Sequence, residues 1–267
     1  MIPGSGFKHG SVGVFGYVVP FAEAGEGDVI VSLPGSAGLE MSTAKDILAQ
    51  SYRVIELDPP GWGATPPLSA TMRQRHLATI LGEALAEMGV SNFSVIGTSM
   101  GGLTALWLAQ QYPDRVNAVI LEGPMAFAQM DDLYNPGAEA MIEAIKSGEI
   151  AGYEGNYPAP PPHPKKPWAD AAFFHEQMRR RFKMFRHTDH PGEQDLLLPF
   201  ARSGTVPITL VLGSEDEILK PSYADTLDAL VPDLAVHRIE GATHDVQNTA
   251  PDAFVDAVNN TLATRRR

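Results

Sequence analysis

The sequence contains no cysteine, and this absence excludes disulfide bonds and thiolate metal sites. It also favours a reducing compartment. No apolar run approaches the ~20 residues that a membrane-spanning helix needs. Residues 1–16 lack the long apolar segment of a secretory signal peptide. We therefore expect a soluble, cytoplasmic protein.

Positive charge is scarce in this chain. It has 20 Lys and Arg residues and 32 Asp and Glu residues, which gives a formal net charge of −12. A surface that binds nucleic acid or an anionic membrane needs basic patches. The charge balance therefore argues against nucleic acid and membrane as partners, so that a small-molecule substrate stays possible, and it leaves the oligomeric state open.

Short apolar runs alternate with helical patterns along most of the chain. Strands are expected at residues 29–33, 52–57, 93–96, 116–121, 206–212 and 233–239, and helices at residues 42–50, 77–88 and 251–264. Unbroken Val, Ile and Leu runs between helices are typical of buried parallel strands. The sequence predicts an α/β fold with a mostly parallel central sheet flanked by helices.

Residues 124–204 interrupt this rhythm. They hold a helical stretch near residues 138–147, then a loop with six prolines between residues 158 and 167, and then a helix over residues 169–186. Since 267 residues suit one large domain or one domain with an insertion, we predict a helical cap at residues 124–204. The α/β core would then comprise residues 1–123 and 205–267.

The most informative stretch is Gly97-Thr98-Ser99-Met100-Gly101, between an expected strand and an expected helix. A strand that turns into a helix around G-x-S-x-G is typical of a nucleophile elbow, which exposes the serine hydroxyl on a strained turn. Side chains at the two glycine positions would collide with the adjoining strand and helix. Ser99 is therefore the predicted nucleophile.

An acid and a base follow later strands. Asp216 comes just after the strand at residues 206–212, and His244 follows the last strand through a glycine-containing turn. A serine hydroxyl needs a base, and the base needs a carboxylate that fixes its tautomer. Because the carboxyl ends of parallel strands share one sheet edge, Ser99, Asp216 and His244 are expected to converge there.

These features resemble the α/β-hydrolase superfamily, in particular its cap-bearing esterases, lactonases and C–C hydrolases. The resemblance covers residues 29–262. It is carried by the elbow, by the turn Asp58…Gly61-Trp62-Gly63, by Gly213…Asp216 and by Gly241…His244. It implies that Ser99, Asp216 and His244 are nucleophile, acid and base, and that no cofactor or metal is needed.

The resemblance also bears on the oxyanion hole and on the choice of acid. It implies that the backbone N–H groups of Ser36 and Met100 stabilise the oxyanion. Relatives often have His-Gly where this chain has Pro34-Gly35, which leaves the geometry of that loop open. Some superfamily members place the acid after the preceding strand, so Glu122 is the alternative to Asp216.

Caps in this family roof the active site. The resemblance therefore implies an apolar substrate pocket lined by Phe173, Phe174, Met178, Met125 and Phe127. The basic run at residues 179–181 has two interpretations, a grip on a substrate carboxylate or a solvated helix face. Since consecutive helical residues point about 100° apart, at most one or two of these arginines can face the site.

The sequence thus predicts a serine hydrolase that cleaves an ester, thioester or lactone of a small to medium apolar substrate through an acyl-enzyme. Four alternatives stay open. The same fold and triad serve C–C bond hydrolases, perhydrolases and cofactor-free dioxygenases, and a ligand receptor can retain the triad.

Overall fold

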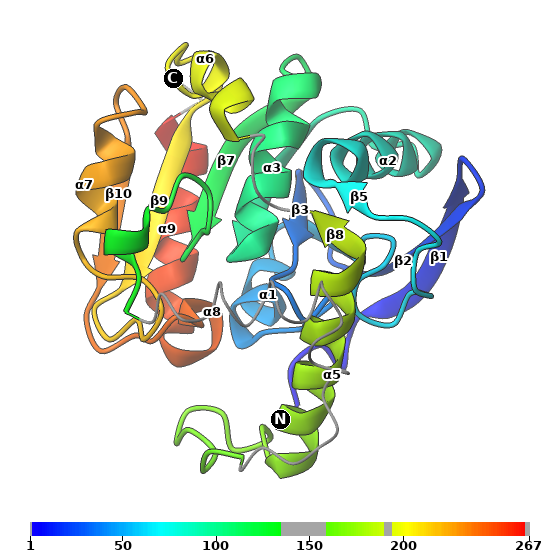
Figure 1. Cartoon of the computed structure of the whole chain (residues 1–267), viewed down its shortest axis with the longest axis horizontal. Coiled ribbons are helices and arrows are strands. Elements are labelled where there is room, and N and C mark those ends of the chain that lie inside the picture. Colours follow the sequence, from blue (N-terminus) through cyan, green and yellow to red (C-terminus); the bar gives the residue numbers. More distant parts are fainter. Residues whose placement is uncertain (1, 135–158, 190–193, 265–267) are drawn as a thin grey trace.

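The computed structural model describes residues 2–134, 159–189 and 194–264 (Figure 1). Its centre is an eight-stranded sheet with the order β1-β2-β4-β3-β6-β7-β9-β10. The strands are β1 Lys8–Val14, β2 Tyr17–Ala24, β3 Val29–Leu33, β4 Arg53–Leu57, β6 Phe93–Thr98, β7 Val116–Glu122, β9 Ile208–Gly213 and β10 Ala235–Ile239. From β4 to β10 every neighbouring pair is parallel. The predicted fold class is confirmed.

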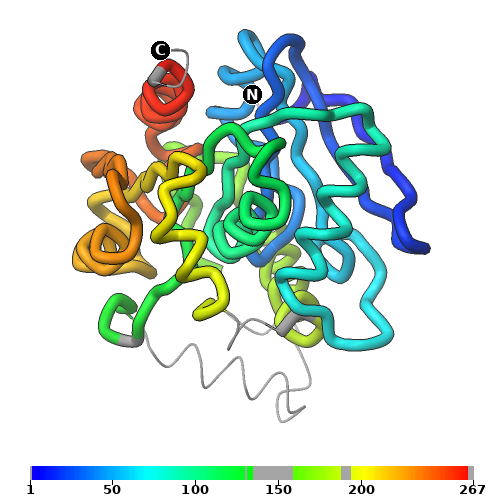
Figure 2. Tube along the Cα trace, turned by 90° about the horizontal axis from the view of Figure 1, so that it is seen from above, coloured from blue at the N-terminus to red at the C-terminus, as the bar shows by residue number. Residues whose placement is uncertain are grey.

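Helices pack on both faces of this sheet. On one face α2 (Gln74–Glu87), α3 (Met100–Gln111) and α7 (Tyr223–Asp228) share a hydrophobic core with the strands. On the other face α1 (Thr43–Leu48), α8 (Val246–Thr249) and α9 (Pro251–Thr264) form a second core. Figure 2 shows α7 and α9 toward one end of the sheet and the N-terminal strands at the other.

The sequence places most of these elements within a few residues. The strand expected at residues 206–212 begins only at Ile208, because Pro207 has no N–H to donate to the sheet; its carbonyl instead accepts from Val119 N at 2.9 Å. Helix α2 ends at Glu87, just before Gly89 with φ of 73°. Apolar periodicity identifies these elements because each buries one face or both.

The first two strands were not expected from the sequence. β1 and β2 form an antiparallel hairpin at the edge of the sheet, turning through Phe15 and Gly16 with φ of 51° and 83°. β1 is mostly exposed, so it has no apolar run to mark it. The hairpin closes the sheet on the far side of β4, away from the elbow strand.

Only part of the segment predicted as a cap stands apart from the core of the fold. Near its ends, Ala126 and Leu133 belong to the core cluster, as do Leu197 of the 3₁₀ turn η2 (Gln194–Leu197) and Ala201 of α6 (Leu198–Ala201). Its long helix α5 (Ala171–His187) instead stands apart from both helical layers (Figure 1). The helix expected at residues 138–147 lies outside the described residues, and the domain boundaries stay a prediction.

Two short strands hold the end of α5. β8 (Thr188–Asp189) follows α5 directly and pairs in parallel with β5 (Met72–Arg73), which precedes α2. The C-terminal end of α5 is thereby attached to the core. Within the part of the chain that the structure describes, no helix combines the length and apolar character needed to cross a membrane.

Candidate active site

Ser99 stands on a strained turn between β6 and α3. Its φ is 50° and its ψ is −116°, a left-handed conformation that L-residues rarely adopt. The glycines on either side permit the turn. A Cβ on Gly97 would lie 2.7 Å from Gly101 O, and one on Gly101 would lie 2.5 Å from Leu33 O. The turn therefore has the geometry of the predicted nucleophile elbow.

His244 and Asp216 are in direct contact. The distance from Nδ1 of His244 to Oδ2 of Asp216 is 2.9 Å. The second oxygen of Asp216 accepts the backbone N–H groups of Ile218 and Leu219, each at 2.8 Å. These bonds hold the carboxylate, which in turn orients the imidazole. The other ring nitrogen, Nε2, is buried and has no hydrogen-bond partner among the described residues.

This contact shifts the pKa of both groups. Burial alone would lower the pKa of His244, but the hydrogen bond and charge of Asp216, with the charges of Glu122 and Glu217, outweigh it and raise that pKa. Burial alone would raise the pKa of Asp216, but His244 and the two backbone N–H groups outweigh it and lower that pKa. Asp216 therefore stays ionised beside an imidazole poised to accept a proton.

The alternative acid, Glu122, is turned elsewhere. It is fully buried, and its Oε2 accepts Thr98 Oγ1 at 2.7 Å and Gln247 Nε2 at 2.5 Å. Its Oε1 accepts Gln247 N at 2.8 Å, and its backbone carbonyl accepts Ser99 N at 2.9 Å. Glu122 thus connects the elbow strand to α8. Among the described side chains, Asp216 holds the imidazole Nδ1 and Glu122 does not.

A cavity of about 490 Å³ joins these groups. Ser99 and His244 both line it, together with the predicted oxyanion residues Ser36 and Met100. Met100 is the first residue of α3, so its N–H has no acceptor within the helix. The loop after β3 lies beside the serine, since a Cβ on Gly35 would be 3.4 Å from Ser99 Cβ. Both residues expected to supply an oxyanion N–H therefore line the same cavity as Ser99.

Helix α5 supplies much of the opposite wall. Four of the five predicted pocket residues line the cavity: Phe173, Phe174, Met178 and Met125. The fifth, Phe127, does not. Its side chain is buried in the core cluster, and its residue borders a separate small hollow with Gln194. Phe127 packs in the core and its backbone N–H donates to Gln194 Oε1, so its expected place in the pocket is not observed.

Helix α5 is attached to the turn after β4 through a lysine. Lys183 Nζ donates to the carbonyls of Trp62 at 3.3 Å, of Thr65 at 2.5 Å and of Gly63. The turn itself is held by Asp58, whose buried carboxylate accepts Ala64 N at 3.0 Å. Burial lowers the pKa of Lys183. These bonds fix α5 above the cavity.

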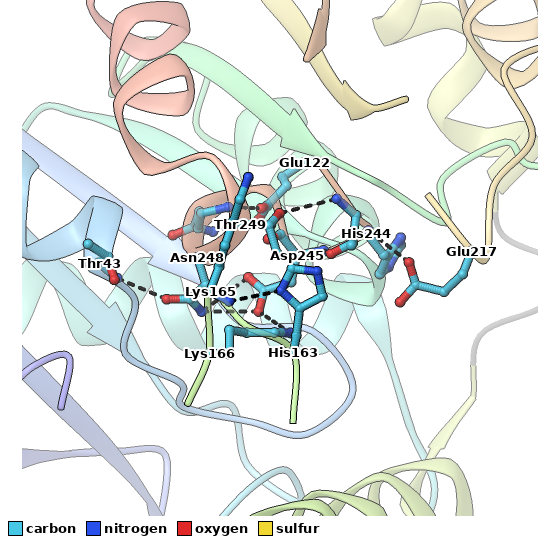
Figure 3. A network of polar contacts seen from close by, with 12 residues as sticks. Thr43, Glu122, His163, Lys165, Lys166, Glu217, His244, Asp245, Asn248 and Thr249 are labelled. Carbon is cyan, nitrogen blue, oxygen red and sulfur yellow. Dashed lines mark hydrogen bonds and ion pairs between the residues drawn. The ribbon is translucent and has the colours of Figure 1, made fainter. Parts of the chain in front are cut away.

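Polar residues that the sequence did not single out surround the histidine (Figure 3). Glu217 Oε2 accepts His244 N at 3.1 Å, and Asp245 pairs with Lys166 at 2.9 Å. Asn248 binds Thr43 N at 3.0 Å and also contacts Asp245. Asp245 and Asn248 follow His244 within one helical turn, which is the signal that could have identified them.

The described residues contain no group of three or more His, Asp or Glu side chains placed to hold a metal ion. The expectation that no metal or cofactor is needed stays a prediction. The catalytic roles assigned to Ser99, Asp216 and His244 also stay predictions. The structure brings Ser99 and His244 to one cavity and places Asp216 in contact with the histidine.

In the comparison with known proteins, a family model matches a little less than half of the chain. Residues 29–144 match the model of the alpha/beta hydrolase fold family. A dihydrolipoyllysine-residue acetyltransferase component of an acetoin cleaving system from Cupriavidus necator is 28% identical over 202 residues, which are 67% of this chain and 49% of that protein. The chain thus spans about half of that relative's length.

Two further matches cover nearly the whole chain. A protein of Escherichia coli O81 named as a carbamate hydrolase, RutD, is 25% identical over 252 residues, 88% of this chain and 91% of that one. The structure of a thermophilic esterase from Thermogutta terrifontis superposes with a TM-score of 0.76 at 19% identity, covering 97% of this chain and all (100%) of that one.

The predicted class, a hydrolase of this fold, is confirmed by these matches, while its reaction and catalytic residues are not settled by them. The sheet order, the geometry of the turn at Ser99 and the family model all indicate the same fold. The chain has the α/β-hydrolase fold.

Proposed function

We propose that this protein is a serine hydrolase that cleaves an ester, thioester or lactone of a small to medium apolar substrate. The observation that carries the proposal is the state of His244. Its Nδ1 is bound to Asp216, while its Nε2 has no partner among the described residues and the residue lines the same cavity as Ser99. An imidazole held in this way can accept the serine proton.

The chemistry follows from the roles of these groups. Ser99 attacks the substrate carbonyl as His244 takes its proton, and Asp216 stabilises the resulting imidazolium. The backbone N–H groups of Ser36 and Met100 stabilise the oxyanion of the tetrahedral intermediate. His244 then returns the proton to the leaving group, and a water activated by the same histidine releases the acyl group.

The helix α5 and the loop before it would roof the site. Phe173, Phe174 and Met178 give the cavity an apolar wall, which suits the acyl or alcohol chain of such a substrate. In this proposal residues 124–204 control which substrate enters, while the core carries the reacting groups.

Labelling by a fluorophosphonate probe and turnover of a panel of p-nitrophenyl esters test the proposal together. Wild-type protein should label at Ser99 and hydrolyse esters, and Ser99→Ala should lose both, with turnover reduced by about 10⁴-fold or more. The variant should fold normally, since alanine is smaller than serine. Turnover by Ser99→Ala within tenfold (about 1.4 kcal/mol) of wild type would rule out the serine mechanism.

A second panel, of vinylogous diketones, is set against the esters to test the C–C hydrolase and receptor alternatives. Cleavage of vinylogous diketones in preference to esters would indicate a C–C hydrolase. A folded protein that neither labels nor turns over any ester would be a ligand receptor on this scaffold.

A further inference from the structure

Two oppositely charged side chains border the cavity without a partner. Arg181 lies on α5, and Glu40 lies in the loop between β3 and α1. The other charged residues of the cavity wall are engaged. Lys166 pairs with Asp245, and Glu217 accepts the backbone N–H of His244. Within the described residues, neither the Arg181 nor the Glu40 side chain has a hydrogen bond or an ion pair.

The neighbouring arginines explain why Arg181 is free. Arg179 and Arg180 both bind Glu176, at 2.8 Å and 2.9 Å. They form salt bridges on the helix surface, as a solvated face does. Arg181 is the member of the basic run that reaches the cavity. Of the two interpretations of this run made from the sequence, the solvated face therefore fits Arg179 and Arg180, and a contact with the substrate fits Arg181.

The charges of Arg181 and Glu40 act on each other through space. Burial raises the pKa of Glu40 most and the charge of Asp245 raises it further, while the positive charges of Arg181, Lys45 and Lys166 lower it. Both side chains border the same cavity, and they do not form an ion pair with each other. A ligand group that lies between them would meet a donor on one side and a carboxyl oxygen on the other.

A third polar group lies one helical turn before Arg181 on the same face of α5. Gln177 lines the cavity with only 7% of its surface exposed. Its Oε1 is buried and has no hydrogen-bond donor among the described residues. An unpaired buried amide oxygen is unfavourable, and the N–H group of a ligand would satisfy it.

On the basis of the proposed hydrolase function, we propose that the substrate carries an uncharged carboxamide-type group at the end away from the scissile bond. Its carbonyl oxygen accepts from Arg181, and its N–H groups donate to Glu40 and Gln177. The remaining chain lies against Phe173, Phe174 and Met178, and the ester carbonyl reaches Ser99.

Other end groups fit these residues less well. A carboxylate satisfies Arg181 but is repelled by Glu40, and an ammonium group satisfies Glu40 but is repelled by Arg181. A methyl end displaces water from both charged groups and offers no hydrogen bond in return. A carboxamide offers an acceptor and two donors without a charge.

The test compares methyl esters with acyl chains of matched length that end in methyl, carboxamide, carboxylate or ammonium. For the wild-type protein, kcat/KM for the carboxamide should exceed each of the others by roughly tenfold or more. Glu40→Gln should shift the preference toward the carboxylate, and Arg181→Gln should shift it toward the ammonium. Arg179→Gln, a matched change outside the cavity wall, should leave the preference unchanged.

Two kinds of outcome would overturn the proposal: a preference of the wild type for the methyl, carboxylate or ammonium ester, or a preference that neither Glu40→Gln nor Arg181→Gln alters. Calorimetric titration of the Ser99→Ala protein with the four esters gives a dissociation constant for each ester in the absence of turnover. These constants should rank the four end groups in the same order as kcat/KM. If the fluorophosphonate failed to label Ser99, the hydrolase function would fall, while this binding order would still decide the end group.

Discussion

Gln247 holds Glu122 through two hydrogen bonds, one from its backbone N–H to Oε1 at 2.8 Å and one from its side-chain amide to Oε2 at 2.5 Å. Gln247 lies in α8, three residues after His244. Glu122 thereby ties the loop that carries His244 to β7, and through Thr98 to the elbow strand. Its place is structural support beneath the site, with the imidazole left to Asp216.

This arrangement predicts different effects for two isosteric changes. Asp216→Asn should reduce kcat by as much as about 10⁴-fold, because the amide no longer fixes the His244 tautomer or stabilises the imidazolium. Glu122→Gln leaves the His244–Asp216 bond in place, so it should reduce kcat by no more than about tenfold. Steady-state kinetics at one pH would compare them, and the reverse ranking would assign the acid to Glu122.

The same glutamate change should instead affect stability. The glutamine amide would turn a donor toward the donors of Gln247 and Thr98, so Glu122→Gln should lower the free energy of unfolding by about 1–3 kcal/mol. Chemical denaturation followed by fluorescence measures this loss. A stability equal to wild type would show that the Glu122 network contributes nothing to the fold.

The pH dependence should reflect the raised pKa of His244. The base works only as neutral imidazole, so kcat/KM should fall as the pH drops through this pKa, which lies above the ordinary 6.5. In Asp216→Asn the negative charge that raises the pKa is gone, and the acid limb should move to lower pH. A profile of residual activity that kept the wild-type limb would contradict this assignment.

The aromatic wall of α5 should govern substrate preference. Replacing Phe173, Phe174 or Met178 by Ala should raise KM or change the preferred chain length, by about tenfold where a contact worth ~1–3 kcal/mol is lost. The rate of labelling by a small fluorophosphonate should persist. Leu196→Ala, on η2 with 56% of its surface exposed, is the control. If all three changes left the preference intact, these side chains would only pack the helix.

Lys183 should matter for the position of α5 rather than for the reaction itself. Lys183→Met removes the bonds to the carbonyls of the turn after β4. It should lower stability by about 2 kcal/mol and raise KM, because α5 is held less firmly above the cavity. Thermal unfolding and ester kinetics measure both effects, with Lys8→Met on the exposed strand β1 as control. An unchanged KM would show that α5 keeps its place without this lysine.

The sequence by itself determined the elements whose signals are local. Apolar runs located the parallel strands, because such strands are buried on both faces. The glycines around Ser99 located the elbow, because the turn excludes any Cβ at those positions. Ser99, Asp216 and His244 each follow a parallel strand, and this position alone placed all three at one sheet edge.

Only the tertiary structure decided between groups that share that edge. Glu122 ends the parallel strand β7 and Asp216 follows β9, and the packing of α8 turned Glu122 toward Gln247 and left Asp216 in contact with His244. Likewise, Arg179 and Arg180 contact Glu176 while Arg181 reaches the cavity. Which way a side chain points depends on the elements packed against it, and those come from distant parts of the chain.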